Sequence, residues 1–376
     1  MAKKAYIGVG GVARKIKKGY VGVNGVARKI KKAYIGIGGV ARPCWGSGDL
    51  EYYGTITGHS VTRQYLAATT VSDYALFGGG RGFYTTKAYT YANVDAYNSS
   101  LIKSSPTGLS QARYDLAAAT VGGYALFGGG YYNKASYNVV DAYDASLTRS
   151  TPTALSNTRH SLAAATVGSS AVFGGGRNGT TYVGTVNAYN ASLTRSIPAI
   201  GLSNARGILA AATIGGYALF GGGQNSDAQS DVVDAYNSSL TKSTPTALSS
   251  ARNGLAAAAV GGYALFGGGM SSGARSNVVD AYDASLTRST PVGLSASRRF
   301  LSAATVINRA LFAGGDSGSS SKVVDAYDTS LTRSIATALN TARYSLAAAT
   351  IGGYALFGGG TNGSSVFNIV DAYTTA

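Results

Sequence analysis

The stretch Ala112–Gly130 reads ARYDLAAATVGGYALFGGG, and versions of it recur seven times along the 376-residue chain. The glycine triplet begins at residues 78, 128, 174, 221, 267 and 358, and Ala313-Gly314-Gly315 replaces it once. An arginine precedes each apolar run, at positions 63, 113, 159, 206, 252, 298 and 343. A period of 45 to 50 residues is typical of a repeat architecture, so the whole region is expected to form one array of similar units.

Each repeat contains four β-like runs, of the kind LAAATV, YALFGGG, NVVDAY and LTRSTP, separated by turn residues. Four short strands recurring at this period indicate the blade of a β-propeller. The small residues of LAAATV suit the innermost strand, because seven strands that converge on one axis leave little room for side chains. We therefore predict an all-β protein with a seven-bladed propeller.

The ends of the repeat array indicate how the ring closes. The seventh repeat stops at Asp371-Ala372-Tyr373 without a fourth run. The segment Leu50–Thr55 precedes Arg63 at nearly the spacing that Leu147 keeps ahead of Arg159. We expect this N-terminal strand to complete the last blade, which removes an open sheet edge.

A second repeat system precedes the propeller. Three copies of a 14-residue unit, beginning AYIGVGGVARKIKK, consist of a β-run, a two-residue Gly-Gly or Asn-Gly turn and another β-run, a pattern that predicts β-hairpins. Residues 1–47 hold eleven Lys and Arg and no acid, whereas the rest of the chain carries 21 basic and 16 acidic residues. We divide the chain into a basic hairpin segment, 1–47, and the propeller, 48–376.

The basic segment has too few large apolar residues for a core of its own, and an isolated hairpin is marginally stable in water. We favour attachment and oligomerisation, with a trimer as the expected state. Binding to acidic polymers such as teichoic acids or DNA and a loosely ordered basic tail are the alternatives. Gly8–Ala13 matches the nucleotide fingerprint G-x-G-x-x-A, but the next hairpin follows within 14 residues and no acid precedes Asp49, so we reject a nucleotide site.

The chain lacks the residues that several classes of function require. The chain has one cysteine, Cys44, and two histidines, His59 and His160, which lie in different repeats away from any acidic cluster with metal-ligand spacing. It contains no P-loop motif. We expect no signal peptide, because the first residues lack the apolar run of one, and no apolar stretch approaches the roughly 20 residues that span a bilayer. We expect no enzyme activity, cofactor, metal or membrane partner, and synthesis in the cytoplasm.

The repeated charged residues have two readings. Asp-Ala-Tyr begins at residues 95, 141, 234, 280, 325 and 371, and Asn187 replaces the acid once. We expect Asp95 to face Lys103 and Tyr97 to face Leu101 across a hairpin, so that the aspartates form cross-strand ion pairs with the fourth strand. The seven arginines either ring the channel mouth and attract an anionic or glycan ligand, or bind loop carbonyls as scaffold, which we favour because every repeat retains one.

Two segments differ among repeats that are otherwise nearly alike: the connection after each glycine triplet and the two residues after each arginine. In an up-and-down blade both emerge at the same end of the ring. Relaxed loops also vary, but Tyr, His, Asp, Arg and Phe together in a concavity are typical of a ligand site. We predict that ligand contacts come from Gln64, Tyr65, Tyr114, Asp115, His160, Ser161, Asn253, Arg299, Phe300 and Tyr344, and from Tyr84, Tyr131, Tyr132, Arg177 and Tyr182 of the connections.

With YALFGGG, the following VVDAY and the preceding arginine, the chain resembles kelch-repeat β-propellers over about 325 residues. Kelch blades usually place Trp in the fourth strand, where this chain has leucine, for example Leu147. Some kelch propellers are copper oxidases with two histidines and a Cys-linked tyrosine, and Cys44 lies outside the propeller, so this activity is not expected.

The hairpins followed by such a propeller are similar to tail-fibre or receptor-binding proteins of phages and phage-derived particles of Gram-positive gut bacteria. This resemblance implies a non-catalytic protein in the tail of a virion or phage-like particle. Its variable face would bind a bacterial surface glycan or protein, and its partners would include other tail or baseplate proteins. The alternative is an intracellular kelch adaptor that binds a protein partner through the same face. Nucleic acid is not an expected partner.

Overall fold

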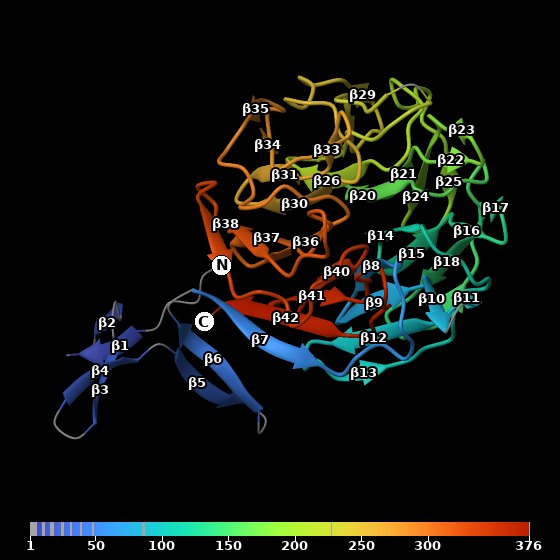
Figure 1. Cartoon of the computed structure of the whole chain (residues 1–376). Coiled ribbons are helices and arrows are strands. Elements are labelled where there is room, and N and C mark those ends of the chain that lie inside the picture. Colours follow the sequence, from blue (N-terminus) through green and yellow to red (C-terminus); the bar gives the residue numbers. More distant parts are fainter. Residues whose placement is uncertain are drawn as a thin grey trace.

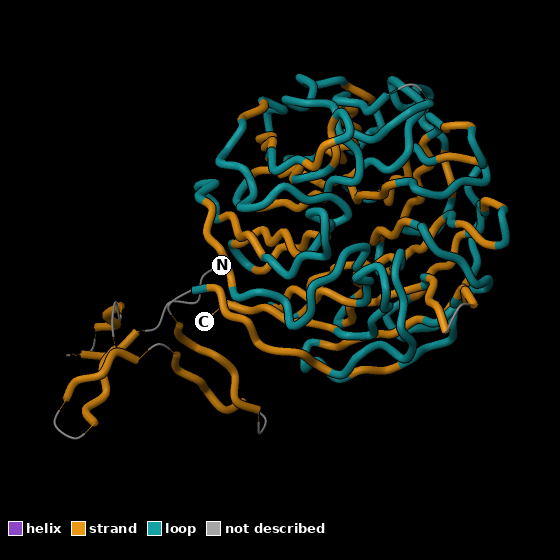
Figure 2. The backbone as a smooth tube through the Cα atoms, in the orientation of Figure 1, coloured by secondary structure: helices purple, strands orange, loops and turns teal. Residues whose placement is uncertain are grey.

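In the computed structural model, seven four-stranded antiparallel sheets surround a central axis (Figure 1). The structure describes residues 49–83, 87–226 and 228–375 in full, and only the backbone of Tyr84 and of six short strands before residue 47. Strands joined by loops and turns make up this part of the chain (Figure 2), and it holds no helix that is long and apolar enough to cross a membrane. The prediction of an all-β protein with seven blades is confirmed.

The strands of a blade follow one another outward from the axis, as Figure 1 shows. In the second blade the order is β14 (Ala117–Val121), β15 (Tyr124–Gly128), β18 (Val140–Tyr143) and β19 (Arg149–Ser150). The first blade has β8 (Ala67–Val71), β9 (Tyr74–Gly78), β12 (Val94–Asn98) and β13 (Lys103–Ser104); the third β20 (Ala163–Val167), β21 (Ser170–Gly174), β24 (Val186–Asn190) and β25 (Arg195–Ser196); the fourth β26 (Ala210–Ile214), β27 (Tyr217–Gly221), β28 (Val233–Asn237) and β29 (Lys242–Ser243); the fifth β30 (Ala256–Val260), β31 (Tyr263–Gly267), β34 (Val279–Asp283) and β35 (Arg288–Ser289); the sixth β36 (Ser302–Val306), β37 (Arg309–Ala313), β38 (Val324–Tyr327) and β39 (Arg333–Ala336).

The seventh blade joins the two ends of the propeller. It consists of β40 (Ala347–Ile351), β41 (Tyr354–Gly358), β42 (Val370–Thr375) and the N-terminal strand β7 (Leu50–Ile56). Strand β7 pairs antiparallel with β42, from Val370 opposite Ile56 to Thr375 opposite Leu50. The predicted closure by the N-terminal strand is therefore confirmed.

The 14-residue repeats form three two-stranded antiparallel sheets. They are β1 (Tyr6–Val9) with β2 (Val12–Lys15), β3 (Gly19–Val23) with β4 (Val26–Ile30), and β5 (Lys32–Ile37) with β6 (Val40–Gly46). The pairs Val9–Val12, Val23–Val26 and Ile37–Val40 close each ladder, as two-residue turns require. The side chains of this segment lie outside the described residues, so its role in attachment and oligomerisation stays a prediction.

The innermost strands contact each other around the axis, as their small side chains predict. Threonine hydroxyls add hydrogen bonds between blades: Thr120 donates to the carbonyl of Thr70 and Thr166 to that of Thr120, both at 2.5 Å. The same bond recurs from Thr213, Thr305 and Thr350. The threonine side chains thus link the innermost strands of neighbouring blades.

The glycine triplet marks the contact between blades. A Cβ atom on Gly128 would lie 2.9 Å from the ring of Phe173 in the next blade, and one on Gly129 would lie 2.6 Å from the carbonyl of Arg159. Gly129 also has φ +70° and Gly130 φ +120°, values that side-chain-bearing residues rarely adopt. The triplet therefore serves blade packing, and the structure gives it no direct place in a site.

The seven repeated arginines are completely buried, which excludes their ringing the channel mouth and confirms the scaffold interpretation. In each blade Nη2 donates to the carbonyl of the second-strand phenylalanine, as Arg252 does to Phe266 at 3.0 Å. In every blade except the third, the guanidinium also pairs with the third-strand aspartate, which is equally buried. The N···O distances are 2.6 Å for Arg63–Asp95, 2.7 Å for Arg113–Asp141, 2.8 Å for Arg206–Asp234, 2.7 Å for Arg252–Asp280 and 2.6 Å for Arg343–Asp371, and Arg298 pairs with Asp325 in the same way.

The fourth-strand cations are only the second partners of these aspartates. Lys103 lies 3.5 Å from Asp95 and Arg333 lies 3.1 Å from Asp325, so the predicted ion pairs form. The predicted register is wrong, because Tyr97 is opposite Lys103. Leu101 lies instead in the turn with φ +63°, and this longer turn shifts the pairing by two residues.

The third blade provides a natural variant of this arrangement. Its Asn187 accepts a hydrogen bond from Nη2 of Arg159 at 2.8 Å, and burial lowers the pKa of Arg159 to about 10. We expect Asn187→Asp to raise the free energy of unfolding by about 2 kcal/mol, because it supplies a charged acceptor to an arginine that is already buried. Thermal unfolding measures the effect. Asp234→Asn makes the reverse change in blade four and should lower the Tm, whereas a lower Tm for Asn187→Asp would contradict the expectation.

Candidate functional site

The two variable segments of each repeat lie side by side. The first residue after the arginine forms an antiparallel bridge with the residue that follows the glycine triplet of the same blade. The seven bridges are Gln64–Arg81, Tyr114–Tyr131, His160–Arg177, Gly207–Gln224, Asn253–Met270, Arg299–Asp316 and Tyr344–Thr361. The expectation that both segments emerge at one end of the ring is therefore correct.

The second residue after each arginine belongs to a closed ring of backbone hydrogen bonds. The members are Tyr65, Asp115, Ser161, Ile208, Gly254, Phe300 and Ser345, and each donates its N–H to the carbonyl of the member before it at 2.8–3.1 Å. Tyr65 closes the ring on Ser345 at 3.0 Å. All seven have φ between 53° and 62°.

This left-handed conformation is strained for residues such as Ile208 (φ 56°) and Phe300 (φ 53°), and it persists only where the surroundings enforce it. The circular hydrogen bonds supply that constraint. Because the backbone of the ring bonds to itself, the side chains of its members are free to differ from blade to blade.

A cavity of about 710 Å³ lies at this ring, within the range typical of small-ligand sites. Its wall includes all seven ring members and the leucine that follows each of them. Between Arg81 and Arg177 the wall also holds Tyr114, Tyr131 and His160. The cavity is thus polar and aromatic at blades one to three, whereas blades four to seven contribute mainly apolar or small side chains.

Five of these side chains form a continuous chain of contacts, which we call the aromatic arc: Arg81, Tyr114, Tyr131, His160 and Arg177. Nη1 of Arg81 donates to the Tyr114 hydroxyl at 3.3 Å, and its guanidinium carbon lies 4.7 Å from the Tyr114 ring centroid. The ring centroids of Tyr114 and Tyr131 are 5.7 Å apart, and those of Tyr131 and His160 are 4.5 Å apart. Nε of Arg177 then donates to Nε2 of His160 at 3.0 Å.

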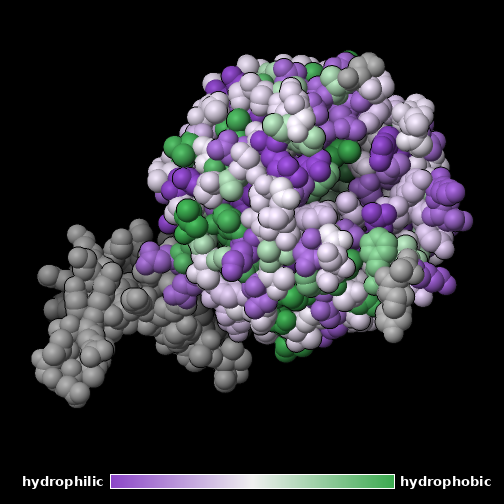
Figure 3. All heavy atoms as spheres, viewed as in Figure 1, coloured by the Kyte–Doolittle hydropathy of each residue, from purple (hydrophilic) through white to green (hydrophobic). Residues whose placement is uncertain are grey.

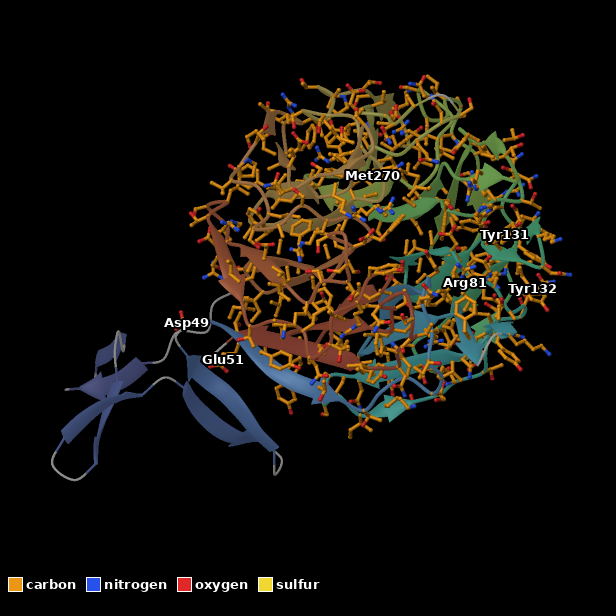
Figure 4. The ribbon with its side chains drawn as sticks, in the orientation of Figure 1. Asp49, Glu51, Arg81, Tyr131, Tyr132 and Met270 are labelled. Carbon is orange, nitrogen blue, oxygen red and sulfur yellow. The ribbon has the colours of Figure 1, made fainter. Side chains whose placement is uncertain are left out.

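The arc begins on small hairpins that follow the second strands. Arg81 starts β10 (Arg81–Tyr84), which pairs with β11 (Lys87–Thr90), and Tyr131 starts β16 (Tyr131–Tyr132), which pairs with β17 (Ala135–Ser136). Figure 4 shows Arg81 and Tyr131 near each other, with Met270 on a more distant blade. In Figure 3 polar and apolar side chains are interspersed over the visible face, so no broad apolar patch marks a different site there.

Burial and charge determine the protonation of the arc. Burial, and then the nearby Arg177 cation, lower the pKa of His160, although the Asp115 carboxylate opposes this shift. Since Nε2 of His160 accepts a hydrogen bond from Arg177, the imidazole is neutral near pH 7. Burial also raises the pKa of Tyr114. The Asp115 carboxylate accepts a hydrogen bond from the Ser161 hydroxyl at 2.5 Å.

Eight of the fifteen predicted ligand contacts line the cavity: Tyr65, Tyr114, Asp115, Tyr131, His160, Ser161, Arg177 and Phe300. Six lie elsewhere, namely Gln64, Asn253, Arg299, Tyr344, Tyr132 and Tyr182, and the side chain of Tyr84 lies outside the described residues.

The residues away from the cavity have partners of other kinds. Arg299 pairs with Asp316 at 3.0 Å, and Tyr182 accepts a hydrogen bond from Gln224 at 2.8 Å. Gln64 and Asn253 are buried at their bridges, and Tyr132 is 43% exposed. The prediction missed Arg81, although its position directly after a glycine triplet, like that of Tyr131 and Arg177, is visible in aligned repeats.

A metal site has no counterpart in the described residues, where no three His, Cys, Asp or Glu side chains gather around a common point. The arc offers hydrogen-bond donors, aromatic faces and cations, and these groups are suited to holding a ligand.

Neither a protein-family model nor a curated protein sequence matches the chain. Among solved structures, one entitled "Structure of YjhT" is similar, with a TM-score of 0.58 and 11% sequence identity, over 75% of this chain and 99% of that one. At this identity the similarity concerns the fold alone. It agrees with the β-propeller fold of this chain.

Proposed function

We propose that the protein is a non-catalytic receptor-binding protein of a phage tail or phage-like particle and that the cavity at the variable end of its propeller binds a bacterial surface glycan or protein. One observation carries the proposal: the seven residues of the hydrogen-bonded ring, which differ among otherwise similar blades, all line one cavity at the axis. Packing explains why the other positions repeat, but it does not require Tyr, Asp, Ser, Ile, Gly and Phe at equivalent places around one opening.

The particle assignment rests on the resemblance of the chain to tail-fibre proteins, together with the basic hairpins ahead of the propeller. In this arrangement residues 1–47 attach the protein to tail or baseplate components and join copies of the chain. The kelch-like repeats supply a rigid support for the site. Labelling of intact bacterial cells by the purified protein tests the proposal, and failure to label any cell type while a cytosolic protein is captured instead would favour the adaptor alternative.

The combined change Tyr65→Ala and Tyr114→Ala is expected to reduce cell labelling at least tenfold, because it removes two aromatic walls of the cavity. The Tm should change little, since both side chains are only half buried. Flow cytometry with fluorescent protein gives the binding, and differential scanning calorimetry gives the Tm. Tyr132→Ala, an exposed tyrosine away from the cavity, is the matched control. Undiminished labelling by the double variant would contradict our choice of site.

A further inference from the structure

The two arginines of the aromatic arc lack acidic partners within the described part of the chain. Other arginines have acidic partners: Arg275 and Arg299 near the rim share Asp316 at 2.9 and 3.0 Å, and Arg309 at the opposite end of its blade lies 3.2 Å from Asp328. Blade three, where Asn187 replaces the aspartate, holds the remaining described arginines without a carboxylate, Arg159 and Arg195. Arg81 and Arg177 are distinct because both line the cavity.

Both guanidinium groups are held in place while part of each remains without a protein acceptor. The rings of Tyr65 and Tyr114 lie 5.0 and 4.7 Å from the guanidinium carbon of Arg81. Arg177 is held through Nε, which donates to His160, so that its two Nη groups have no described acceptor. A guanidinium presents paired N–H donors that match the oxygens of carboxylate or phosphate. The cavity wall therefore carries N–H donors that can bind an anion.

The charge balance of the wall is positive. Its ionisable side chains are Arg81, Arg177, Asp115 and the Tyr and His groups, and His160 is neutral as described above. Two cations against one carboxylate leave a net charge of about +1, and the Asp115 carboxylate already accepts the Ser161 hydroxyl. Such a site attracts anions and disfavours cations. Apolar surface for the rest of the ligand comes from the tyrosine rings beside the two arginines and from the seven leucines of the cavity wall.

We propose that the cavity binds an acidic sugar, with its carboxylate or phosphate against the free N–H groups of Arg177 and Arg81 and its ring against the tyrosines of the aromatic arc. This inference rests on the proposed function for the choice of a glycan and adds the chemical class that the site selects. The cavity volume of about 710 Å³ has room for a terminal sugar and part of its neighbour.

The test uses the full chain and three defined probes: methyl glucuronide, glucose 1-phosphate and neutral methyl glucoside. Saturation-transfer NMR and titration calorimetry are expected to detect binding of at least one of the two acidic probes, with a dissociation constant of about 1 mM. The glucoside should bind much more weakly. Arg177→Gln should weaken binding of the acidic probe at least tenfold. Arg81→Gln is the second variant. Arg195→Gln is the matched control, because Arg195 also lacks an acidic partner in the described structure but lies on β25 away from the cavity.

The outcomes distinguish a carboxylate ligand from a phosphate ligand, and they distinguish failure of this inference from failure of the proposed function. Glucuronide binding alone assigns a carboxylate sugar, and glucose 1-phosphate binding alone assigns a phosphate sugar. The inference is overturned if the glucoside binds as well as the acidic probes, if no acidic probe binds, or if Arg177→Gln leaves binding unchanged. Cell labelling that persists in Arg177→Gln would leave the proposed function in place without acidic selectivity. Binding of an acidic sugar without cell labelling would support the acidic selectivity and contradict the proposed function.

Discussion

An Asp280→Ala variant is expected to lose about 3–5 kcal/mol of unfolding free energy, the usual effect of removing one partner of a buried ion pair. Asp280 and Arg252 are both completely buried and lie 2.7 Å apart. Without the carboxylate, the guanidinium keeps its hydrogen bond to the Phe266 carbonyl. Its positive charge then has no opposite charge beside it, although it is buried away from water. Chemical unfolding followed by circular dichroism measures the loss.

The matched control is Asp283→Ala in the same blade. Its carboxylate accepts the N–H groups of Ser285 and Thr287 in a turn, both at 2.9 Å, and has no buried arginine to neutralise. Its removal should cost only about 1 kcal/mol. The double change Arg252→Met with Asp280→Leu should recover much of the stability lost by Asp280→Ala, because no isolated charge remains in the interior. Equal losses for Asp280→Ala and Asp283→Ala would contradict the assignment of the pair as scaffold.

Acid is expected to destabilise the propeller through His59. This side chain is 2% exposed at the junction of the last and first blades, and burial, followed by the Arg63 cation, lowers its pKa well below 6.5. The unfolded chain therefore binds a proton that the folded chain does not. Stability is full above about pH 6.5 and falls by up to about 1.4 kcal/mol for each unit of pH below it, until the folded-state pKa is reached.

His59→Leu should raise the Tm and flatten this pH dependence. The other six blades have leucine at the equivalent place, at residues 109, 155, 202, 248, 294 and 339, all buried. In those blades the hydroxyl of the third-strand tyrosine donates to the carbonyl of the residue two positions before this leucine, as Tyr143 does to Thr107 at 2.8 Å. In the first blade the Tyr97 hydroxyl instead contacts Nδ1 of His59 at 3.2 Å. The variant leaves the Thr57 carbonyl as the equivalent partner for Tyr97.

Thermal unfolding of the wild type and of His59→Leu between pH 7.5 and 4.5 measures the difference, and His160→Gln measures the separate contribution of the only other histidine, whose pKa burial also lowers. We expect the curve of the wild type to fall more steeply than that of His59→Leu. Parallel curves would show that His59 does not titrate on unfolding.

Much of the architecture could be predicted because it is periodic. The recurring LAAATV and YALFGGG runs indicated seven blades, and the missing fourth run after Tyr373 indicated the partner of β7. The Arg–Asp pairs could not be predicted in the same way. Arg252 and Asp280 are separated by 28 residues, and their contact depends on burial between two strands that the sequence does not describe.

The site was predicted in part. Comparison of the repeats located the variable segments, and the structure places eight of the fifteen predicted residues on the cavity wall. The direction of each side chain was not visible in the sequence. Arg299 turns to Asp316 at the rim, whereas Arg177, at the residue that follows its own triplet, lines the cavity.

The sequence by itself determined the number of blades, the closing strand and the end of the ring at which the copies differ, because each repeat buries the same apolar residues at the same spacing. Only the tertiary structure decided which variable residues meet. The hydrogen-bonded ring of left-handed residues brings together positions about 46 residues apart, and the aromatic arc crosses three blades. Such contacts depend on the curvature of the closed ring and on the direction of side chains, neither of which is encoded in the pattern of any single repeat.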